Sequence, residues 1–140
     1  MGLKGPLVSC VAQRNVDQVP IDMIKKQRSR DNNSHHITIL NRFEINSLFE
    51  KTDKTKTKKE FCRDLLQKLS EEVPDDWIDS GLGYLKHEDC EAYFRVLDWP
   101  AANTFRSSLG LSEHHFHITM GFSPKDIHNI SKGPETIVVP

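Results

Sequence analysis

Residues 114–122 read His-His-Phe-His-Ile-Thr-Met-Gly-Phe, and the interpretation of the whole chain depends on this stretch. Apolar residues take every second position from 116 to 122, with His117, Thr119 and Gly121 between them. Such alternation is typical of a β-strand with one buried face and one face turned elsewhere. On that second face His117 and Thr119 lie side by side, so a group able to transfer protons is next to a hydroxyl donor. The stretch therefore predicts a strand that presents both side chains together.

A second stretch, residues 35–40, repeats the arrangement as His-His-Ile-Thr-Ile-Leu. His36 and Thr38 occupy alternate positions, and two isoleucines supply the apolar face. Of the seven histidines, only His36 and His117 are followed two residues later by threonine or serine. Two imidazoles, each beside a hydroxyl and each on a predicted strand, suit chemistry on a phosphate group.

This pair of His-apolar-Thr-apolar motifs, residues 36–39 and 117–120, resembles the two-histidine (2H) phosphoesterase superfamily, which includes cyclic phosphodiesterases and RNA 2′-5′ ligase-like proteins. The resemblance extends over nearly the whole chain, so we expect a single 2H phosphoesterase-like domain over residues 1–140. It implies an α+β, bilobal fold. In that fold two antiparallel-sheet lobes carry helices on the outside, and one motif strand from each lobe lines a central cleft.

Length and composition set limits on the partners. The 140 residues suffice for one domain with a sizeable core. The net charge of −1 argues against binding duplex nucleic acid, but it is compatible with a small nucleotide or an RNA end as substrate. Three scattered cysteines, no apolar membrane span and no signal-peptide core favour an intracellular protein, cytoplasmic or nuclear, that binds no membrane. We expect a monomer.

The coarse pattern of elements mixes helices and strands, as an α+β fold requires. The clearest helix is predicted over 58–72, where apolar residues fall at helical spacing. Other predicted helices begin at Pro20, after Asn41, at Ala101 and at Ser123, the last with Pro124 at its first position and Asp126 reaching back. Strands are predicted over 7–12, 35–40, 82–87, 91–97, the second motif and 136–139, with 82–87 and 91–97 forming a hairpin.

The chemistry needs a base, an acid and donors that hold the phosphoryl oxygens. Two histidines can share the acid and base roles near neutral pH. By resemblance, His117 is the base and His36 the acid in the hydrolysis of a cyclic phosphate, while Thr38 and Thr119 bind the phosphoryl oxygens. Alternation also turns His115 toward the same face, so we expect it at the edge of the cleft as a further substrate-binding residue.

These roles need no metal and no cofactor. The alternative is a zinc site, in which His115 and His117 would be two ligands on one strand face. Spacing in the sequence supplies no third ligand, and the two threonines would have no function in such a site. We therefore expect metal-independent catalysis.

The resemblance implies a phosphodiesterase that hydrolyses a 2′,3′-cyclic phosphate or a 2′-5′ phosphodiester in a nucleotide or short RNA. Two alternatives remain open: a 3′-5′ RNA-trimming enzyme that leaves a cyclic phosphate, and a nucleotide-binding module of the same fold with little turnover. Residues 51–59, Lys-Thr-Asp-Lys-Thr-Lys-Thr-Lys-Lys, fit either contact with RNA phosphates or an exposed loop entering a helix.

Overall fold

The computed structural model describes residues 7–11, 19–31, 35–128 and 130–140. The chain divides into two compact units, each assembled from three segments. The first unit comprises Met1–Ser9, Thr38–Asp76 and Trp99–His114. The second unit comprises Cys10–Ile37, Trp77–Asp98 and His115–Pro140. The prediction of a single domain over the full length stays a prediction.

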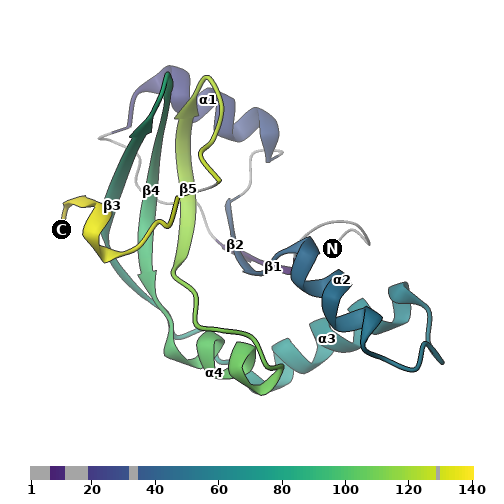
Figure 1. The fold of residues 1–140 in the computed structure, drawn as a ribbon. Coiled ribbons are helices and arrows are strands. Elements are labelled where there is room, and N and C mark those ends of the chain that lie inside the picture. The colour runs from purple at the N-terminus through teal and green to yellow at the C-terminus, as the bar shows by residue number, and fades with distance from the viewer. Residues whose placement is uncertain (1–6, 12–18, 32–34, 129) are drawn as a thin grey trace. The chain divides into compact units, whose positions relative to one another are not determined.

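The strands follow the hydrogen-bonded order β1-β2-β5-β4-β3-β6 (Figure 1). The pairs β2–β5, β5–β4, β4–β3 and β3–β6 are antiparallel. Their bounds are β1 Leu7–Val11, β2 His35–Leu40, β3 Ile78–His87, β4 Cys90–Asp98, β5 Phe116–Ser123 and β6 Ile137–Val139. Ala12, the last residue of the predicted first strand, lies outside the described residues. The α+β class is confirmed, whereas the expected division into two sheet lobes is not.

The hairpin of the second unit is formed as predicted. β3 and β4 pair from Ile78↔Asp98 to His87↔Cys90, and the connecting Glu88 has a φ of 56°. Apolar side chains on one face of β4 form the core of this unit together with residues from β5 and the following segment. The core residues are Ala92, Phe94, Val96, Phe122 and Ile127.

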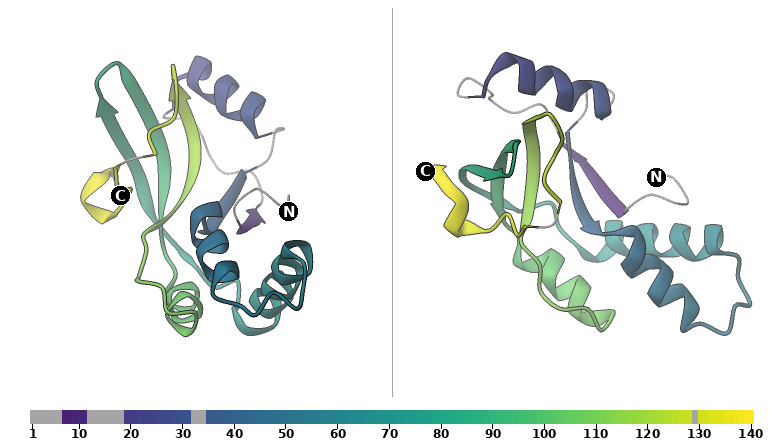
Figure 2. Two further views of the ribbon diagram at one scale, coloured as in Figure 1. Left: turned by 45° about the vertical axis from the view of Figure 1, so that its right-hand side comes forward. Right: turned by 45° about the horizontal axis from the view of Figure 1, so that its top comes forward.

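Helix α1 (Ile21–Arg30) begins directly after Pro20, as predicted, and packs against β5 within the second unit (Figure 2). The close approach depends on Gly121. A Cβ there would lie 2.8 Å from Val19 Cγ1 and 3.0 Å from the Met23 carbonyl carbon. Glycine at this strand position therefore lets the backbone of the helix reach the backbone of the sheet.

The first unit contains the other three helices, α2 (Arg42–Glu50), α3 (Lys58–Glu72) and α4 (Pro100–Ser108). Asn41 and Thr57 each form a capping box with the glutamate three residues later, which explains where α2 and α3 begin. The predicted bounds of α3 are confirmed.

Arg106 of α4 is almost fully buried at 2% exposure, and its guanidinium binds three different groups of the first unit. It forms a bidentate ion pair with Glu44, in which Nη1 is 2.9 Å from Oε1 and Nη2 is 2.6 Å from Oε2. It also donates to the Ile39 and Ser112 carbonyl oxygens. One buried cation thus joins α4 to α2 and to the end of β2.

The prediction of a helix that begins at Ser123 is wrong. β5 continues through Ser123, which pairs with Glu91 of β4, and residues 124–128 form bends without helical hydrogen bonds. Asp126 does not cap a helix, because its carboxylate accepts from Arg30, from Lys132 and from the Ile127 backbone amide. A short 3₁₀ turn, Pro134–Thr136, precedes β6. Tertiary ion pairing has replaced the local capping that the sequence suggested.

Among the described residues, no helix has the length and apolar character needed to cross a membrane.

Candidate active site

The two motif strands are immediate neighbours, paired antiparallel through Ile37 of β2 and Ile118 of β5. Both isoleucines are fully buried. One step along this ladder places His36 across from Thr119, and facing side chains have Cβ atoms about 5 Å apart. His117 is then the diagonal neighbour of His36, at roughly 7–8 Å.

Burial follows the predicted alternation on β2 from His35 to Ile39, whereas on β5 it does so only from Phe116 to Ile118, since residues 118–122 are all buried. His36, Thr38 and His117 are half-buried, while the isoleucines between them face the core. Thr119 is 8% exposed. The structure therefore brings His36, His117 and Thr119 to one face within the second unit. Thr38 belongs to the first unit, and its place beside the histidines stays a prediction.

Phe94 of β4 forms the wall against His117. Their ring centroids are 6.0 Å apart with an interplanar angle of 72°, an edge-on contact that restrains the imidazole. In the sheet register Phe94 faces Thr119 on one side and Gly83 of β3 on the other. A Cβ on Gly83 would lie 2.3 Å from a Phe94 ring carbon, so the ring occupies the space that a side chain would fill.

A register shift between Tyr93 and Phe94 changes which β5 residues share the His117 face. Ala92 pairs with Phe122 and Val96 pairs with His117, and Ala92 and Val96 lie on one face of β4. Phe122 and His117 therefore also share a face, although five positions separate them. Strict alternation from the sequence would have placed Phe122 on the opposite side.

An ion-pair cluster lies next to Phe94. Lys132 Nζ is 5.5 Å from the Phe94 ring centroid and 3.1 Å from Asp126 Oδ1. Asp126 Oδ2 also accepts from Arg30, at 2.6 Å. The Asp126 and Lys132 side chains are 3% and 4% exposed. The cluster fastens the segment after β5 over the Phe94 ring, and so over the wall of the histidine site.

The charges of this cluster reinforce one another. Burial by itself raises the pKa of Asp126, but the charge of Lys132 and the hydrogen bond from Arg30 lower the pKa by more, so the net shift is downward. Burial lowers the pKa of the Lys132 ammonium group despite the neighbouring carboxylate. The sequence predicted a different role, helix capping, for Asp126 and none for Arg30 or Lys132, because 96 positions separate Arg30 from Asp126 and no local pattern marks the cluster.

Residues 1–128 match the family model of the Swiss Army Knife 2H phosphoesterase domain. The chain belongs to this family. The comparisons with curated proteins and with solved structures gave no match. Membership supports a phosphodiesterase-type activity, and it confirms the resemblance that the two His-x-Thr motifs indicated.

A carboxylate accompanies His36 of this 2H domain. Asp31, directly after α1, accepts from both Arg30 and Gln27. Burial by itself raises the pKa of Asp31. The hydrogen bond from Arg30 and the positive charges of Arg30 and His36 lower the pKa by more, so the net shift is downward.

His115 differs from the expectation in one respect. It is exposed and precedes the first residue of β5, so strand alternation does not fix the direction of its side chain. It lies beside Gly133, where an added Cβ would be 3.0 Å from His115 Cδ2. Its role in substrate binding stays a prediction.

A hollow of about 500 Å³ opens between α1 and the end of β5 in the second unit. Its floor is Phe122, with Arg30 stacked 4.7 Å above the ring centroid. Positive side chains exceed negative ones around it. The lining residues are Lys26, Ser29, Arg30, Phe122, Pro124, Lys125, Asp126 and His128.

In the part of the chain that the structure describes, no three His, Cys, Asp or Glu side chains are grouped as ligands of a metal ion.

Proposed function

We propose that this 2H phosphoesterase domain is a metal-independent phosphodiesterase that hydrolyses a 2′,3′-cyclic phosphate or a 2′-5′ phosphodiester in a nucleotide or short RNA. The observation that carries the proposal is the pairing of Ile37 with Ile118. This pairing supports a pair of imidazoles on either side of a phosphoryl group, with Thr119 directly across from His36.

In the proposed hydrolysis of a cyclic phosphate, His117 takes a proton from water as the water oxygen attacks phosphorus. The bond from phosphorus to one ribose oxygen breaks, and His36 gives its proton to that oxygen. Water is thus added across one P–O bond, and the product is a phosphate monoester. Thr38 and Thr119 donate hydrogen bonds to the non-bridging oxygens, where charge accumulates in the transition state.

The test is to incubate the protein with 2′,3′-cyclic nucleotides and with 2′-5′-linked oligoadenylate, with and without excess EDTA. We expect ring opening or cleavage that EDTA does not reduce. Loss of activity in EDTA that zinc or manganese restores would contradict the metal-independent mechanism.

The histidine roles have their own test. His36→Ala and His117→Ala should each reduce kcat/KM by about a hundredfold or more, since that is what general acid–base catalysis typically contributes. His87→Ala is the matched control, because His87 lies exposed at the end of β3 and should leave turnover unchanged. The parent should also show a bell-shaped pH profile. Turnover in His36→Ala within a few-fold of the parent would make β2 a binding strand only.

The same assay separates the alternatives. An RNA-trimming enzyme would shorten a 3′-hydroxyl oligonucleotide and leave a cyclic phosphate, in which case acid and base exchange roles. A binding module of the same fold would bind the cyclic nucleotides and release no product.

A specific observation favours an RNA end over a free nucleotide within this proposal. Phe122, the floor of the basic hollow, shares a strand face with His117 and is five strand residues away from it, which is about 17 Å. A ligand that reaches both places is longer than a single nucleotide. In an RNA that ends in a cyclic phosphate, the phosphates of the preceding nucleotides would bind Lys26 and Lys125.

A further inference from the structure

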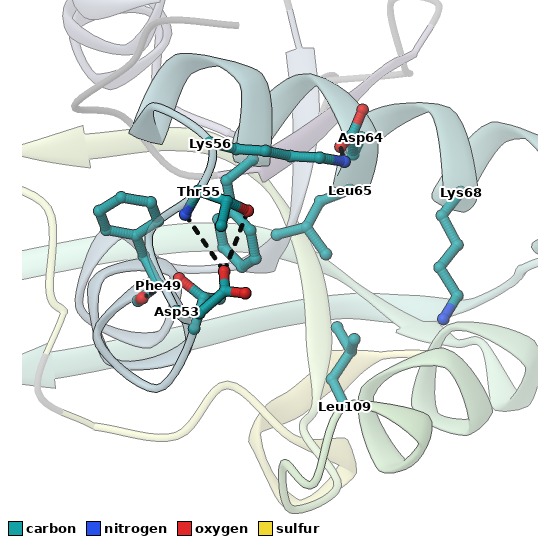
Figure 3. Close-up of a pocket in the computed structure, with 10 residues that line it drawn as sticks. Phe49, Asp53, Thr55, Lys56, Asp64, Leu65, Lys68 and Leu109 are labelled. Atoms are coloured by element: carbon teal, nitrogen blue, oxygen red, sulfur yellow. Dashed lines mark hydrogen bonds and ion pairs between the residues drawn. The ribbon is translucent and has the colours of Figure 1, made fainter.

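The first unit contains a pocket of about 340 Å³ that takes no part in the histidine site (Figure 3). It lies between the end of α2, the connection over residues 51–57 and the face of α3, and Leu109 closes it after α4. This volume is within the range of small-molecule sites. The lining residues are Phe49, Thr52, Asp53, Thr55, Lys56, Phe61, Asp64, Leu65, Lys68 and Leu109.

The interior of the pocket is aromatic and aliphatic. The Phe49 and Phe61 rings lie 5.5 Å apart with a tilt of 54°. Leu65 and Leu109 complete the apolar wall. These tilted rings offer a face and an edge to a planar ring of a ligand.

The connection that shapes the pocket is held by its own hydrogen bonds. Thr52 Oγ1 donates to the Phe49 carbonyl oxygen at 2.7 Å, and Lys56 forms an ion pair with Asp64. The Thr55 backbone amide and hydroxyl both donate to Asp53 Oδ1, at 3.1 and 3.0 Å. The pocket is therefore preformed, and Asp53 Oδ2 carries neither of the Thr55 bonds.

Charge at the rim distinguishes between possible ligands. The lining residues include two lysines and two aspartates, so the lining itself has no net charge, although residues 49–68 as a whole contain seven Lys and Arg against four Asp and Glu. Lys56 is neutralised by Asp64, whereas Lys68 has no ion pair with any residue that the structure describes. Figure 3 shows Phe49 and Asp53 on one side of the pocket and Lys68 on the other. A ligand that uses the whole pocket carries an aromatic ring at one end and an anion at the other.

We propose that this pocket binds a nucleoside phosphate, with the base against Phe49 and Phe61 and the phosphate at Lys68. The second oxygen of Asp53 accepts from an amino group of the base or a ribose hydroxyl. An apolar peptide side chain would leave the Lys68 charge unused, and a fatty acid would set its methylene groups against the Asp53 carboxylate. This site goes beyond the proposed catalytic function, because neither motif histidine contributes to it.

The test is an NMR titration of the full chain with 5′-AMP, which as a monoester is not a substrate of a phosphodiesterase. We expect shifts at the Leu65 and Leu109 methyl groups, and the same shifts in the His36→Ala/His117→Ala double variant. Adenosine and ribose 5-phosphate should each bind more weakly than 5′-AMP, because each lacks one half of the ligand. Absence of shifts at these two leucines at millimolar 5′-AMP would overturn the proposal, as would stronger binding of hexanoate than of 5′-AMP.

The variant that isolates the anion contact is Lys68→Gln. It should weaken 5′-AMP binding about five- to tenfold and leave adenosine binding unchanged, as expected for loss of one charge-assisted hydrogen bond. Lys59→Gln is the matched control, since Lys59 is on the same helix but does not line the pocket. Equal effects of both variants would overturn the phosphate position at Lys68. A short adenine oligonucleotide, compared with 5′-AMP, tells whether the ligand is a free nucleotide or one base of an RNA strand.

Discussion

Gly83 has no side chain, and this absence makes room for the Phe94 ring beside His117. The Phe94 ring lies over Gly83 and meets His117 edge-on, and Phe94 is completely buried. Because the ring cannot move outward into solvent, any side chain on Gly83 must displace it within the core.

We therefore predict that Gly83→Ala destabilises the protein by about 1–3 kcal/mol through overpacking and also lowers kcat. Gly110→Ala is a useful comparison, because Gly110 has a φ of 81° but no atom within 4 Å of an added Cβ. That variant should cost only about 1 kcal/mol of backbone strain and leave kcat unchanged. Urea unfolding and turnover of a cyclic nucleotide measure both effects. Recovery of stability in Gly83→Ala/Phe94→Leu would identify ring crowding as the cause.

Asp126 is a second residue whose contribution to stability depends on its environment. It lies between two cations, Arg30 and Lys132, and is nearly inaccessible to water. Asp126→Asn keeps the shape but leaves two positive charges close together, so we expect a loss of roughly 3 kcal/mol. Asp79→Asn, which breaks the more exposed pair with Arg95, should cost less than about 1 kcal/mol. Similar losses of unfolding free energy in both variants would mean that burial does not strengthen the Asp126 cluster.

At the scale of elements, Arg106 joins α4, α2 and the end of β2 through four donated hydrogen bonds, two of which form its ion pair with Glu44, all within the first unit. Arg106→Met fills the space but removes the guanidinium from the Ile39 carbonyl oxygen and from the Glu44 carboxylate, which keeps only the Asn41 backbone amide as a donor. We predict a loss of about 3 kcal/mol, since removing one partner of a buried charge pair is costly. Arg95→Met is the control and should cost under about 1 kcal/mol. Thermal unfolding of the two variants distinguishes the cases.

The hollow between α1 and the end of β5 yields a prediction on substrate length. Lys26→Glu and Lys125→Glu should each lower kcat/KM about three- to tenfold for an oligonucleotide that ends in a 2′,3′-cyclic phosphate, because each removes attraction for a strand phosphate and adds repulsion. Hydrolysis of a cyclic mononucleotide, which does not reach the hollow, should be unchanged. Lys86→Glu on β3 is the control, because Lys86 does not line the hollow. If both substrates are affected equally, the strand does not cross this surface.

At the scale of the whole molecule, three carboxyl groups in the two units make stability depend on pH. Burial raises the pKa values of Asp31, Glu44 and Asp126, but hydrogen bonds and charges from arginine and lysine lower them by more. Each folded pKa is thus below the unfolded value of about 4. The resulting stabilisation is fully present above about pH 4 and is lost as the pH falls through the folded pKa values.

Thermal unfolding measured between pH 6.5 and pH 3 should therefore show a falling Tm below about pH 4. Asp126→Asn should begin from a lower Tm and lose less on acidification, since one of the three titrating groups is absent. An equal acid-induced loss in the parent and in this variant would contradict the linkage to Asp126.

Local patterns in the sequence determined much of the fold and the centre of the site. Helical spacing predicted α3 over Lys58–Glu72, and alternation predicted β2 over His35–Leu40 together with its buried and half-buried faces. These features follow from the period of a helix or strand, which neighbouring residues carry by themselves. The family could also be predicted, because each His-x-Thr motif fits within one strand.

Only the tertiary structure decided the pairing of Ile37 with Ile118, the register shift at Phe94 and the Arg30–Asp126–Lys132 cluster. The failed helix at Ser123 has the same origin. A capping pattern is worth about 1 kcal/mol, and the continued β4–β5 ladder together with two ion pairs to Asp126 outweighed it. Such contacts join residues far apart in the chain, and their strength depends on the burial that folding creates. Local periodicity contains no information about that burial.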